Sequence, residues 1–323
     1  MQWSEFPIKT NIVFYLDYAS RCSLRACSKH DLAAVDATPF VADEISIHEL
    51  PGNLDSQKSN IRVRIDTFTI WFVGKNDVTR VERSVNGNEL EWAETLHEKR
   101  HDVSRRFLDK FVKGGKFHAK RITIESKNIL PSEHWNLKCD YLKLTSLGQS
   151  EVWAATWIGK VTSRLKTLEV FSWNVLGLSE LAQISTVSER LRIEDLSDLT
   201  DEQLDRIPAN HLQITSKCIS LEGVKRAVAR FLRKGKREDD LNLSFNFPSG
   251  FEVRDLFPAG VVLRKLDTKP PPYGVYKIVG GFENENGFND VRDFFFNYSN
   301  ILIQGSPPQK KKFQCLLYPF TAN

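Results

Sequence analysis

One five-residue motif has residue types and a spacing that could support metal-dependent hydrolysis. His97, Glu98 and His101 match the pattern H-E-x-x-H. On a helix, residues four apart share a face, so two imidazoles could bind zinc while the glutamate acts as general base on a zinc-bound water. The apolar periodicity predicts a long amphipathic helix over residues 89 to 113, and that helix would carry the motif.

The surroundings of this motif argue against a metal centre. Lys99 and Arg100 fill its variable positions, and no third ligand follows at a preferred spacing. Both histidines fall on the polar flank of the predicted helix, where side chains normally meet solvent. We therefore expect a solvated helix flank with no metal, and a zinc hydrolase stays as the alternative hypothesis.

The chain also lacks the common motifs of nucleophilic catalysis and nucleotide binding. There is no G-x-S-x-G, no G-x-x-x-x-G-K-[ST] and no G-x-G-x-x-G. We expect no catalytic residues and no cofactor. A binding protein is favoured over an enzyme.

Composition predicts a folded chain and excludes several partners. The chain has 323 residues, of which 41% are hydrophobic and 27% charged, and its net charge is only +4 with both signs interspersed. We therefore expect no nucleic-acid partner. The 5 cysteines form no C-x-x-C pair, and no apolar run is long enough for a membrane span, so we expect a cytoplasmic or nuclear protein that contacts no membrane.

The first 42 residues predict a compact helical unit of three short helices. Phe6-Pro7 begins the first helix and Asp17 ends it. Ser20 is the expected N-cap of the second helix. The third helix, around residues 31 to 35, ends before Thr38-Pro39, because the residue before a proline is disfavoured in a helix.

A strand-helix pattern with a regular spacing dominates the middle of the chain. Residues 43 to 118 predict two strands, at 61 to 65 and 68 to 73, followed by the long helix. Residues 119 to 246 contain strands of the form x-L-x-[LIV]. Their first apolar residues are spaced 20 to 29 residues apart, as in leucine-rich-repeat-like units, and are Ile122, Leu142, Leu168, Leu191, Leu212 and Leu241. An ordinary α/β domain with evenly spaced strands is the alternative.

Residues 247 to 323 predict a small, mostly β C-terminal cap. Five short strands are expected there, separated by proline-rich and glycine-rich turns: 261 to 266, 275 to 279, 294 to 298, 301 to 303 and 313 to 317. The expected fold class is therefore α/β, with a three-helix N-terminal module, an irregular leucine-rich-repeat-like strand-helix domain, and this β-rich part.

The N-terminal unit resembles the F-box, in the version found in the large nematode families of F-box proteins. The resemblance is carried by Phe6-Pro7, by Tyr15-Leu16-Asp17, by the stretch from Ser20 to Lys29, and by Val35-Asp36. It is closest over residues 16 to 38. The leucine-rich region is similar to the F-box-associated repeats of such proteins.

The resemblance implies a substrate-recognition subunit of a cullin-RING ubiquitin ligase of the SCF type. F-box proteins dock through this module onto the Skp-family adaptor of the cullin complex, while the C-terminal region selects a protein substrate. Carried over by position, the adaptor-binding residues would be Phe6, Pro7, Leu16, Leu24, Cys27 and Val35. This hypothesis requires an accessible apolar surface around Leu24.

Substrate recognition would then fall on the repeat strands. The residues between the two apolar positions of each strand point away from the core and would line one face of the sheet: Lys143, Glu169, Arg192, Gln213 and Asn242. Such a polar surface of mixed charge suits an unknown protein or peptide partner. The remaining alternative is a non-catalytic repeat scaffold whose N-terminal helices only cap the repeats.

Overall fold

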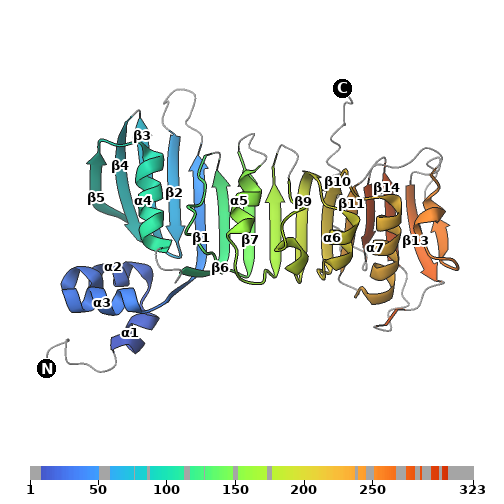
Figure 1. The fold of residues 1–323 in the computed structure, drawn as a ribbon, viewed down its shortest axis with the longest axis horizontal. Helices are drawn as coiled ribbons and strands as arrows, with labels where there is room; N and C mark the ends of the chain where they lie inside the picture. Colours follow the sequence, from blue (N-terminus) through green and yellow to red (C-terminus); the bar gives the residue numbers. More distant parts are fainter. Residues whose placement is uncertain are drawn as a thin grey trace.

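The computed structural model describes most of the chain between residues 9 and 304. The described ranges are 9–50, 59–75, 77–85, 88–112, 117–126, 128–147, 152–172, 177–236, 239–244, 251–266, 274–280, 284–285, 292–297 and 300–304. Within them the chain forms seven α-helices and one sheet of 15 strands, so the α/β class is confirmed (Figure 1). None of these helices is long and apolar enough to cross a membrane.

The three expected N-terminal helices are present and pack on one another. They are α1 (Lys9–Tyr15), α2 (Tyr18–Cys27) and α3 (Lys29–Ala37), and together we call them the helical module. The N-cap of α2 is Asp17, whose carboxylate accepts a hydrogen bond from the backbone N–H of Ser20 at 2.7 Å. The prediction that Ser20 caps this helix was wrong, because Asp17 satisfies the free N–H three residues later.

Parallel strands form the centre of the sheet. They are β1 (Phe40–Leu50), β6 (Phe117–Ser126), β7 (Tyr141–Ser146), β8 (Thr167–Phe171), β9 (Arg190–Ser197), β10 (His211–Ser216) and β11 (Asp240–Ser244). The six predicted repeat positions lie directly opposite one another, in register from Ile122 to Leu241. Ile45 of β1, which the sequence did not predict as a strand, extends this row by one strand.

Antiparallel strands extend the sheet on both sides. One side carries β2 (Ser59–Ile65), β3 (Phe68–Lys75), β4 (Val78–Val85) and β5 (Asn88–Leu96), and the other carries β15 (Asn300–Gln304), β14 (Arg292–Asn297), β13 (Gly274–Gly280) and β12 (Val262–Lys265). The strands expected near β2, β3 and β12 to β15 are confirmed; the one expected at 313 to 317 lies outside the described residues. Because β15 pairs with β11, the C-terminal strands continue the same sheet and do not form a separate cap.

The long helix predicted over residues 89 to 113 is wrong in its first half. The chain forms β5 up to Leu96 and then the shorter helix α4 (Arg100–Val112). Residues Glu89 to Trp92 alternate polar and apolar types, and pairing with β4 supplies hydrogen bonds that the sequence alone does not reveal. Strand pairing therefore overrides the helical periodicity at this point.

The four α-helices that follow the helical module lie on one face of the sheet (Figure 1). They are α4, α5 (Trp153–Gly159), α6 (Asp201–Arg206) and α7 (Leu221–Lys234), with 3-10 turns at Ile184–Thr186 and Val253–Leu256. The rows of isoleucine and leucine point toward them and form the core. No described α-helix covers the opposite face, which we call the bare face and which carries Arg121, Thr123 and Glu125 of β6 with their register partners.

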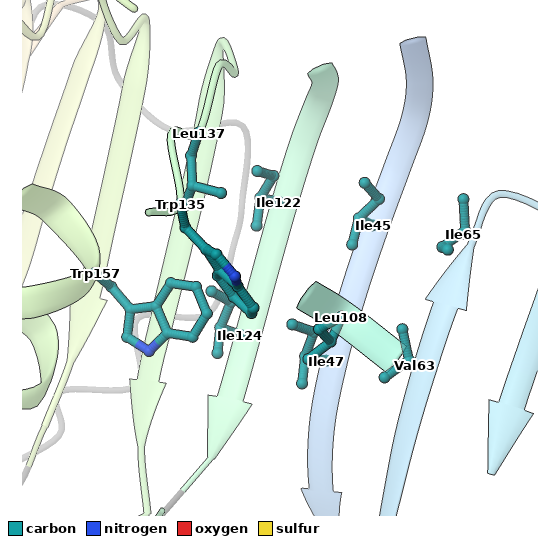
Figure 2. Close-up of a pocket in the computed structure, with 10 residues that line it drawn as sticks. All are labelled: Ile45, Ile47, Val63, Ile65, Leu108, Ile122, Ile124, Trp135, Leu137 and Trp157. Carbon is teal, nitrogen blue, oxygen red and sulfur yellow. The ribbon is translucent and has the colours of Figure 1, made fainter. Parts of the chain in front are cut away.

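A small apolar void of about 20 Å³ lies in the core above β1 and β6, in the space between α4 and α5 (Figure 2). Leu108 of α4 borders it on one side, and the indoles of Trp135 and Trp157 border it on the other. The space is about that of one water molecule and its lining is entirely apolar, so it has nothing to hold a polar ligand. We assign it to imperfect packing between two helices.

One glycine gives a sharp test of the contact between α6 and α7. A Cβ atom on Gly223 would lie 2.1 Å from Oδ1 of Asp201, and that carboxylate is held by the backbone N–H and the hydroxyl of Ser220 at 2.8 and 2.5 Å. Gly→Ala in a helix normally stabilises by roughly 1 kcal/mol. We expect Gly223→Ala to lower the free energy of unfolding by about 1–3 kcal/mol in urea titrations.

The matched control is Gly159→Ala at the end of α5, where nothing lies within 4 Å of the added atom. That variant should leave the free energy of unfolding unchanged or raise it by up to about 1 kcal/mol, because alanine is the better helix former. Equal effects of the two substitutions would show that the Asp201 contact is not tight.

Candidate functional site

The helical module buries few apolar side chains of its own. Among its described residues only Val13 and Val35 are buried hydrophobics. The module rests on the sheet through Tyr18, whose ring lies 5.7 Å from that of Phe40 and 5.1 Å from that of Phe68. A unit this small cannot be stable through its own core, so polar contacts and neighbouring surfaces must hold it together.

The buried guanidinium of Arg21 provides the main polar contacts of the module. Only 4% of this residue is exposed, and it donates hydrogen bonds to four backbone carbonyls. The acceptors are Leu16 at 3.1 Å, Phe14 at 3.3 Å, Thr38 at 3.0 Å and Pro39 at 3.0 Å. Its guanidinium carbon also lies 5.0 Å from the centre of the Phe40 ring. Arg21 therefore ties the end of α1, the start of α2 and the junction with β1 to one another, a role the sequence did not predict.

Several apolar side chains of the module face solvent. The exposed fractions are 38% for Ile12, 53% for Phe14, 85% for Tyr15 and 37% for Leu32. The rings of Phe14 and Tyr15 meet edge to face with their centroids 5.4 Å apart. Aromatic side chains gathered in this way on a small helical unit are typical of a protein-binding surface.

The residues predicted to bind an adaptor differ in their exposure to solvent. Leu16 and Leu24 are half-buried, and Cys27 is exposed. Val35 is only 7% exposed, so it packs inside the module and its side chain is not accessible. Phe6 and Pro7 lie outside the described residues. The exposed apolar surface of the module thus centres on Phe14 and Tyr15. The sequence could have indicated this, because two successive aromatic residues of a helix cannot both face one core.

The five residues predicted to bind substrate form one continuous row on the bare face. Lys143, Glu169, Arg192, Gln213 and Asn242 are successive register partners on β7 to β11. All five are half-buried, as expected for side chains on an open sheet face. The structure therefore brings together the whole predicted set.

Cations lie over aromatic rings beside this row. The guanidinium of Arg121 lies 4.7 Å from the centre of the Tyr141 ring. The Phe171 ring has Nζ of Lys143 at 5.2 Å and the guanidinium of Arg192 at 5.0 Å. The sequence analysis did not assign Arg121, Tyr141 and Phe171 to this surface. Arg121 and Tyr141 occupy the first position of the x-L-x-[LIV] pattern, and Phe171 directly follows its last position.

Tyr141 also orients the central carboxylate of the row. Its hydroxyl donates to Oε2 of Glu169 at 3.0 Å. Burial, followed by the bond to Glu169 and its negative charge, raises the pKa of Tyr141 to about 12. The phenol is therefore neutral at physiological pH and remains a hydrogen-bond donor.

The motif at residues 97 to 101 does not form the geometry that a zinc site of this type needs. Helix α4 begins at Arg100, so His97 and Glu98 precede the helix that carries His101. Glu98 forms a two-pronged ion pair with Arg106 at 2.8 and 2.9 Å. In the described part of the chain no group of three or more His, Cys, Asp or Glu side chains could hold a metal ion.

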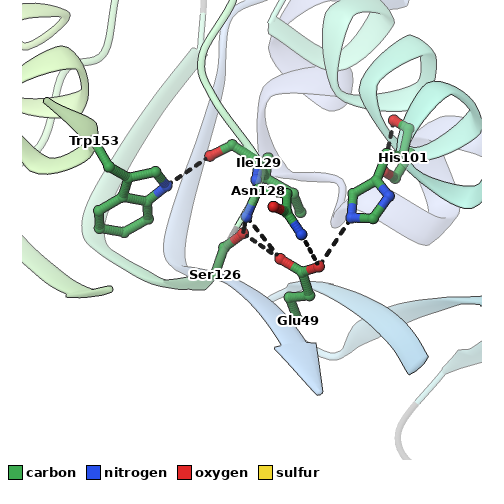
Figure 3. A network of polar contacts seen from close by, with 7 residues as sticks. Glu49, His101, Ser126, Asn128, Ile129 and Trp153 are labelled. Atoms are coloured by element: carbon green, nitrogen blue, oxygen red, sulfur yellow. Dashed lines mark hydrogen bonds and ion pairs between the residues drawn. The ribbon is translucent and has the colours of Figure 1, made fainter. Parts of the chain in front are cut away.

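His101 instead belongs to a polar network at the end of β1 (Figure 3). Its Nε2 lies 2.9 Å from Oε1 of Glu49. The same carboxylate accepts from the Ser126 hydroxyl at 2.8 Å, and from the backbone and side-chain nitrogens of Asn128 at 2.9 and 3.0 Å. The carbonyl of Ile129 then accepts from the indole of Trp153 at 2.9 Å. Glu49 thus links β1, α4, and the loop after β6, which in turn contacts α5 through the bond from Trp153 to Ile129.

The electrostatics of Glu49 follow from these partners. Burial acts to raise its pKa, but the hydrogen bonds from His101, Ser126 and Asn128 more than offset that effect. The pKa of Glu49 therefore lies well below its ordinary value. Although His101, Glu49 and Ser126 are types found in catalytic triads, here the carboxylate lies between the other two, so the hydroxyl has no imidazole beside it to act as its base.

Comparison with known proteins adds no relative. No family model matches the chain, no curated protein matches it, and no solved structure matches it.

Arg21 should control the module without affecting the sheet. Arg21→Lys keeps the charge but cannot reach four carbonyls with one ammonium. We expect the loss of these buried bonds to cost about 1–3 kcal/mol within the module. Limited proteolysis should then cut between α1 and α3, while thermal unfolding of the sheet is unchanged. Arg25→Lys, at an exposed position of α2, is the control, and equal protection of both variants would contradict this role of Arg21.

Glu49 should make folding stability sensitive to acid. Its folded pKa lies below its ordinary value of 4.5, so its contribution is complete above that pH and is lost as the pH falls below it. Glu49→Gln should lower the free energy of unfolding by about 1–3 kcal/mol at pH 7, and the deficit should shrink on going from pH 5 to pH 3. Urea titrations at several pH values measure this. Glu180→Gln, at an exposed carboxylate, should have no such effect; a constant deficit for Glu49→Gln would refute the assignment.

Proposed function

We propose that this chain is a substrate-recognition subunit of a cullin-RING ubiquitin ligase. In this proposal the helical module docks onto the Skp-family adaptor and the bare face of the sheet receives a protein substrate. The observation that carries it is the apolar surface of the module, where Phe14 is 53% and Tyr15 85% exposed with their rings in contact. Leu16 and Leu24 of the same module are half-buried. Burial of such side chains against a partner is the main source of affinity in helix-mediated docking.

The separation of the two surfaces supports the same proposal. Tyr18 attaches the module to Phe40 and Phe68, and Phe68 is a buried residue of β3 on the helix-covered side. The predicted substrate row lies on the opposite face, on β7 to β11. A receptor of this kind must hold an adaptor and a substrate at the same time, and this arrangement leaves both surfaces free.

A role for the module as a mere end cap of the repeats has less support. The strand order places β2 to β5 beyond β1, so in the described part of the chain the outermost strands are β5 and β12. The module lies beside the sheet and does not close either end (Figure 1). If the module served only as an end cap, its exposed aromatic residues would have no role in the structure.

Docking can be tested at Phe14. Phe14→Asp places a charge in the centre of the proposed contact, where it would be buried without a partner. We expect the affinity of the full chain for the Skp-family adaptor to fall by at least about thirtyfold in calorimetric titrations, as for a hot-spot residue. Circular dichroism of the variant should be unchanged, since Phe14 makes few contacts within the chain.

The matched control is Val152→Asp, which places the same charge at another exposed apolar position, 64% exposed, just before α5. This variant should bind the adaptor normally. If the unmodified chain fails to bind the adaptor, or if Phe14→Asp binds as well as Val152→Asp does, the proposed function is wrong.

A further inference from the structure

The bare face offers a partner more positive charge than the small net charge of the whole chain, +4, indicates. Its carboxylates are mostly engaged by neighbours on the same face. These pairs are Glu169 with Tyr141 at 3.0 Å, Glu125 with His48 at 3.1 Å, Asp240 with His211 at 3.4 Å, and Glu194 with Arg192. Three cations on the same strands, Arg121, Lys143 and Arg190, have no carboxylate within 4 Å among the described residues.

Two buried N–H groups on this face also lack an acceptor. Nε of Arg62 and Nε of Arg192 are buried and form no hydrogen bond within the described part of the chain. Arg62 lies with its guanidinium 5.3 Å from the centre of the Trp71 ring, and Arg192 lies over Phe171 at 5.0 Å. A buried donor without an acceptor is destabilising, so Arg192 favours a ligand that brings an oxygen acceptor to β9, whereas Arg62 lies on β2, two strands beyond β6.

The aromatic rings are arranged for an acidic peptide and against a nucleic acid. Single-stranded nucleic acids bind such sheets by stacking bases on free ring faces. Here Arg121 lies over Tyr141, and Lys143 and Arg192 lie over Phe171, so cations already lie against these rings. The interspersed carboxylates, such as Glu169, can accept hydrogen bonds from peptide N–H groups, which a nucleic-acid backbone lacks.

From this arrangement we infer that the bare face around β6 to β9 binds an extended acidic segment of a partner protein, rich in Asp and Glu. The inference rests on the proposed function in one respect, since this segment would belong to the substrate. Strands lie about 4.8 Å apart, so the distance from Arg121 on β6 to Arg190 and Arg192 on β9 is roughly 14 Å, or about four residues of extended peptide. Carboxylates within a window of about five residues could therefore reach all these cations.

The test uses the full chain and a fluorescein-labelled twelve-residue peptide of alternating Glu and Ser, followed by fluorescence anisotropy. Arg121→Ala combined with Lys143→Ala should weaken binding by about tenfold or more, because each charged contact contributes appreciably. The matched control is Lys225→Ala with Arg206→Ala, which removes two positive charges from the helix-covered side. It should change affinity by less than about twofold, because distant surface charges are screened at physiological salt.

Three outcomes would overturn the inference. One is no binding of the acidic peptide by the unmodified chain, and another is equal binding of a peptide of alternating Lys and Ser. The third is tighter binding of a twelve-nucleotide oligouridine, with the same loss on substitution of Arg121 and Lys143, which would identify a nucleic-acid surface instead.

Failure of this inference and failure of the proposed function give different results. Phe14→Asp should bind the acidic peptide normally, and the double variant at Arg121 and Lys143 should bind the Skp-family adaptor normally. If the adaptor does not bind but the peptide does, the ubiquitin-ligase proposal fails while the acidic-segment site stands. If the adaptor binds and the peptide does not, the reverse holds.

Discussion

The register of the central strands is the constraint on which the rest of this structure depends. Ile45, Ile122, Leu142, Leu168, Leu191, Leu212 and Leu241 lie side by side in one row, and the residues two positions later form a second buried row from Ile47 to Leu243. Side chains alternate between the two faces of a strand. A shift of one residue in the pairing of a strand would therefore turn its core leucines toward solvent and its bare-face residues, such as Lys143, toward the helices. The same alternation that builds the core therefore also builds the bare face.

A buried serine lies at the end of five of the central strands, or directly after it. Ser126, Ser146, Ser172, Ser197 and Ser216 are all at most 4% exposed. The hydroxyl of Ser126 accepts from the backbone of Ile129 at 2.8 Å, and that of Ser216 donates to the carbonyl of Leu199 at 2.7 Å. Ser126 and Ser216 thus satisfy backbone groups of loops that turn away from the sheet, where a buried group without a partner would be costly.

Glu49 occupies the corresponding place on β1. Its preceding residue, His48, pairs with Glu125, so Glu49 falls beside Ser126. A carboxylate is longer than a hydroxyl and accepts more bonds. It can therefore reach both His101 of α4 and the backbone of Asn128, which a serine could not. The row of serines begins with a residue able to attach the antiparallel side of the sheet to the repeats.

Local pattern and long-range pairing explain what the sequence could and could not predict. The repeat strands and the row from Lys143 to Asn242 were predictable, because alternation and spacing lie within each short segment. The helix expected over 89 to 113 was wrong since β5 is specified by pairing with β4. The contact of Lys143 with Phe171, and the bonds from Arg21 to Thr38 and Pro39, were not predictable, because they join residues separated by many positions of chain.

The contrast between module and sheet has a physical consequence for how the two surfaces work. The sheet has a continuous core from β3 to β15, whereas the described part of the module has only two buried hydrophobic residues, Val13 and Val35, and depends on Arg21. A ligand that binds only the folded form of a marginally stable unit stabilises that unit by mass action. A partner that covers Phe14 and Tyr15 would therefore strongly stabilise the folded form of the module.

A ligand on the bare face, by contrast, binds strands that are already fixed by their neighbours. The protein therefore loses little conformational entropy when this ligand binds. The two surfaces thus differ in kind: one gains its structure in part from its partner, and the other presents a preformed array of charges.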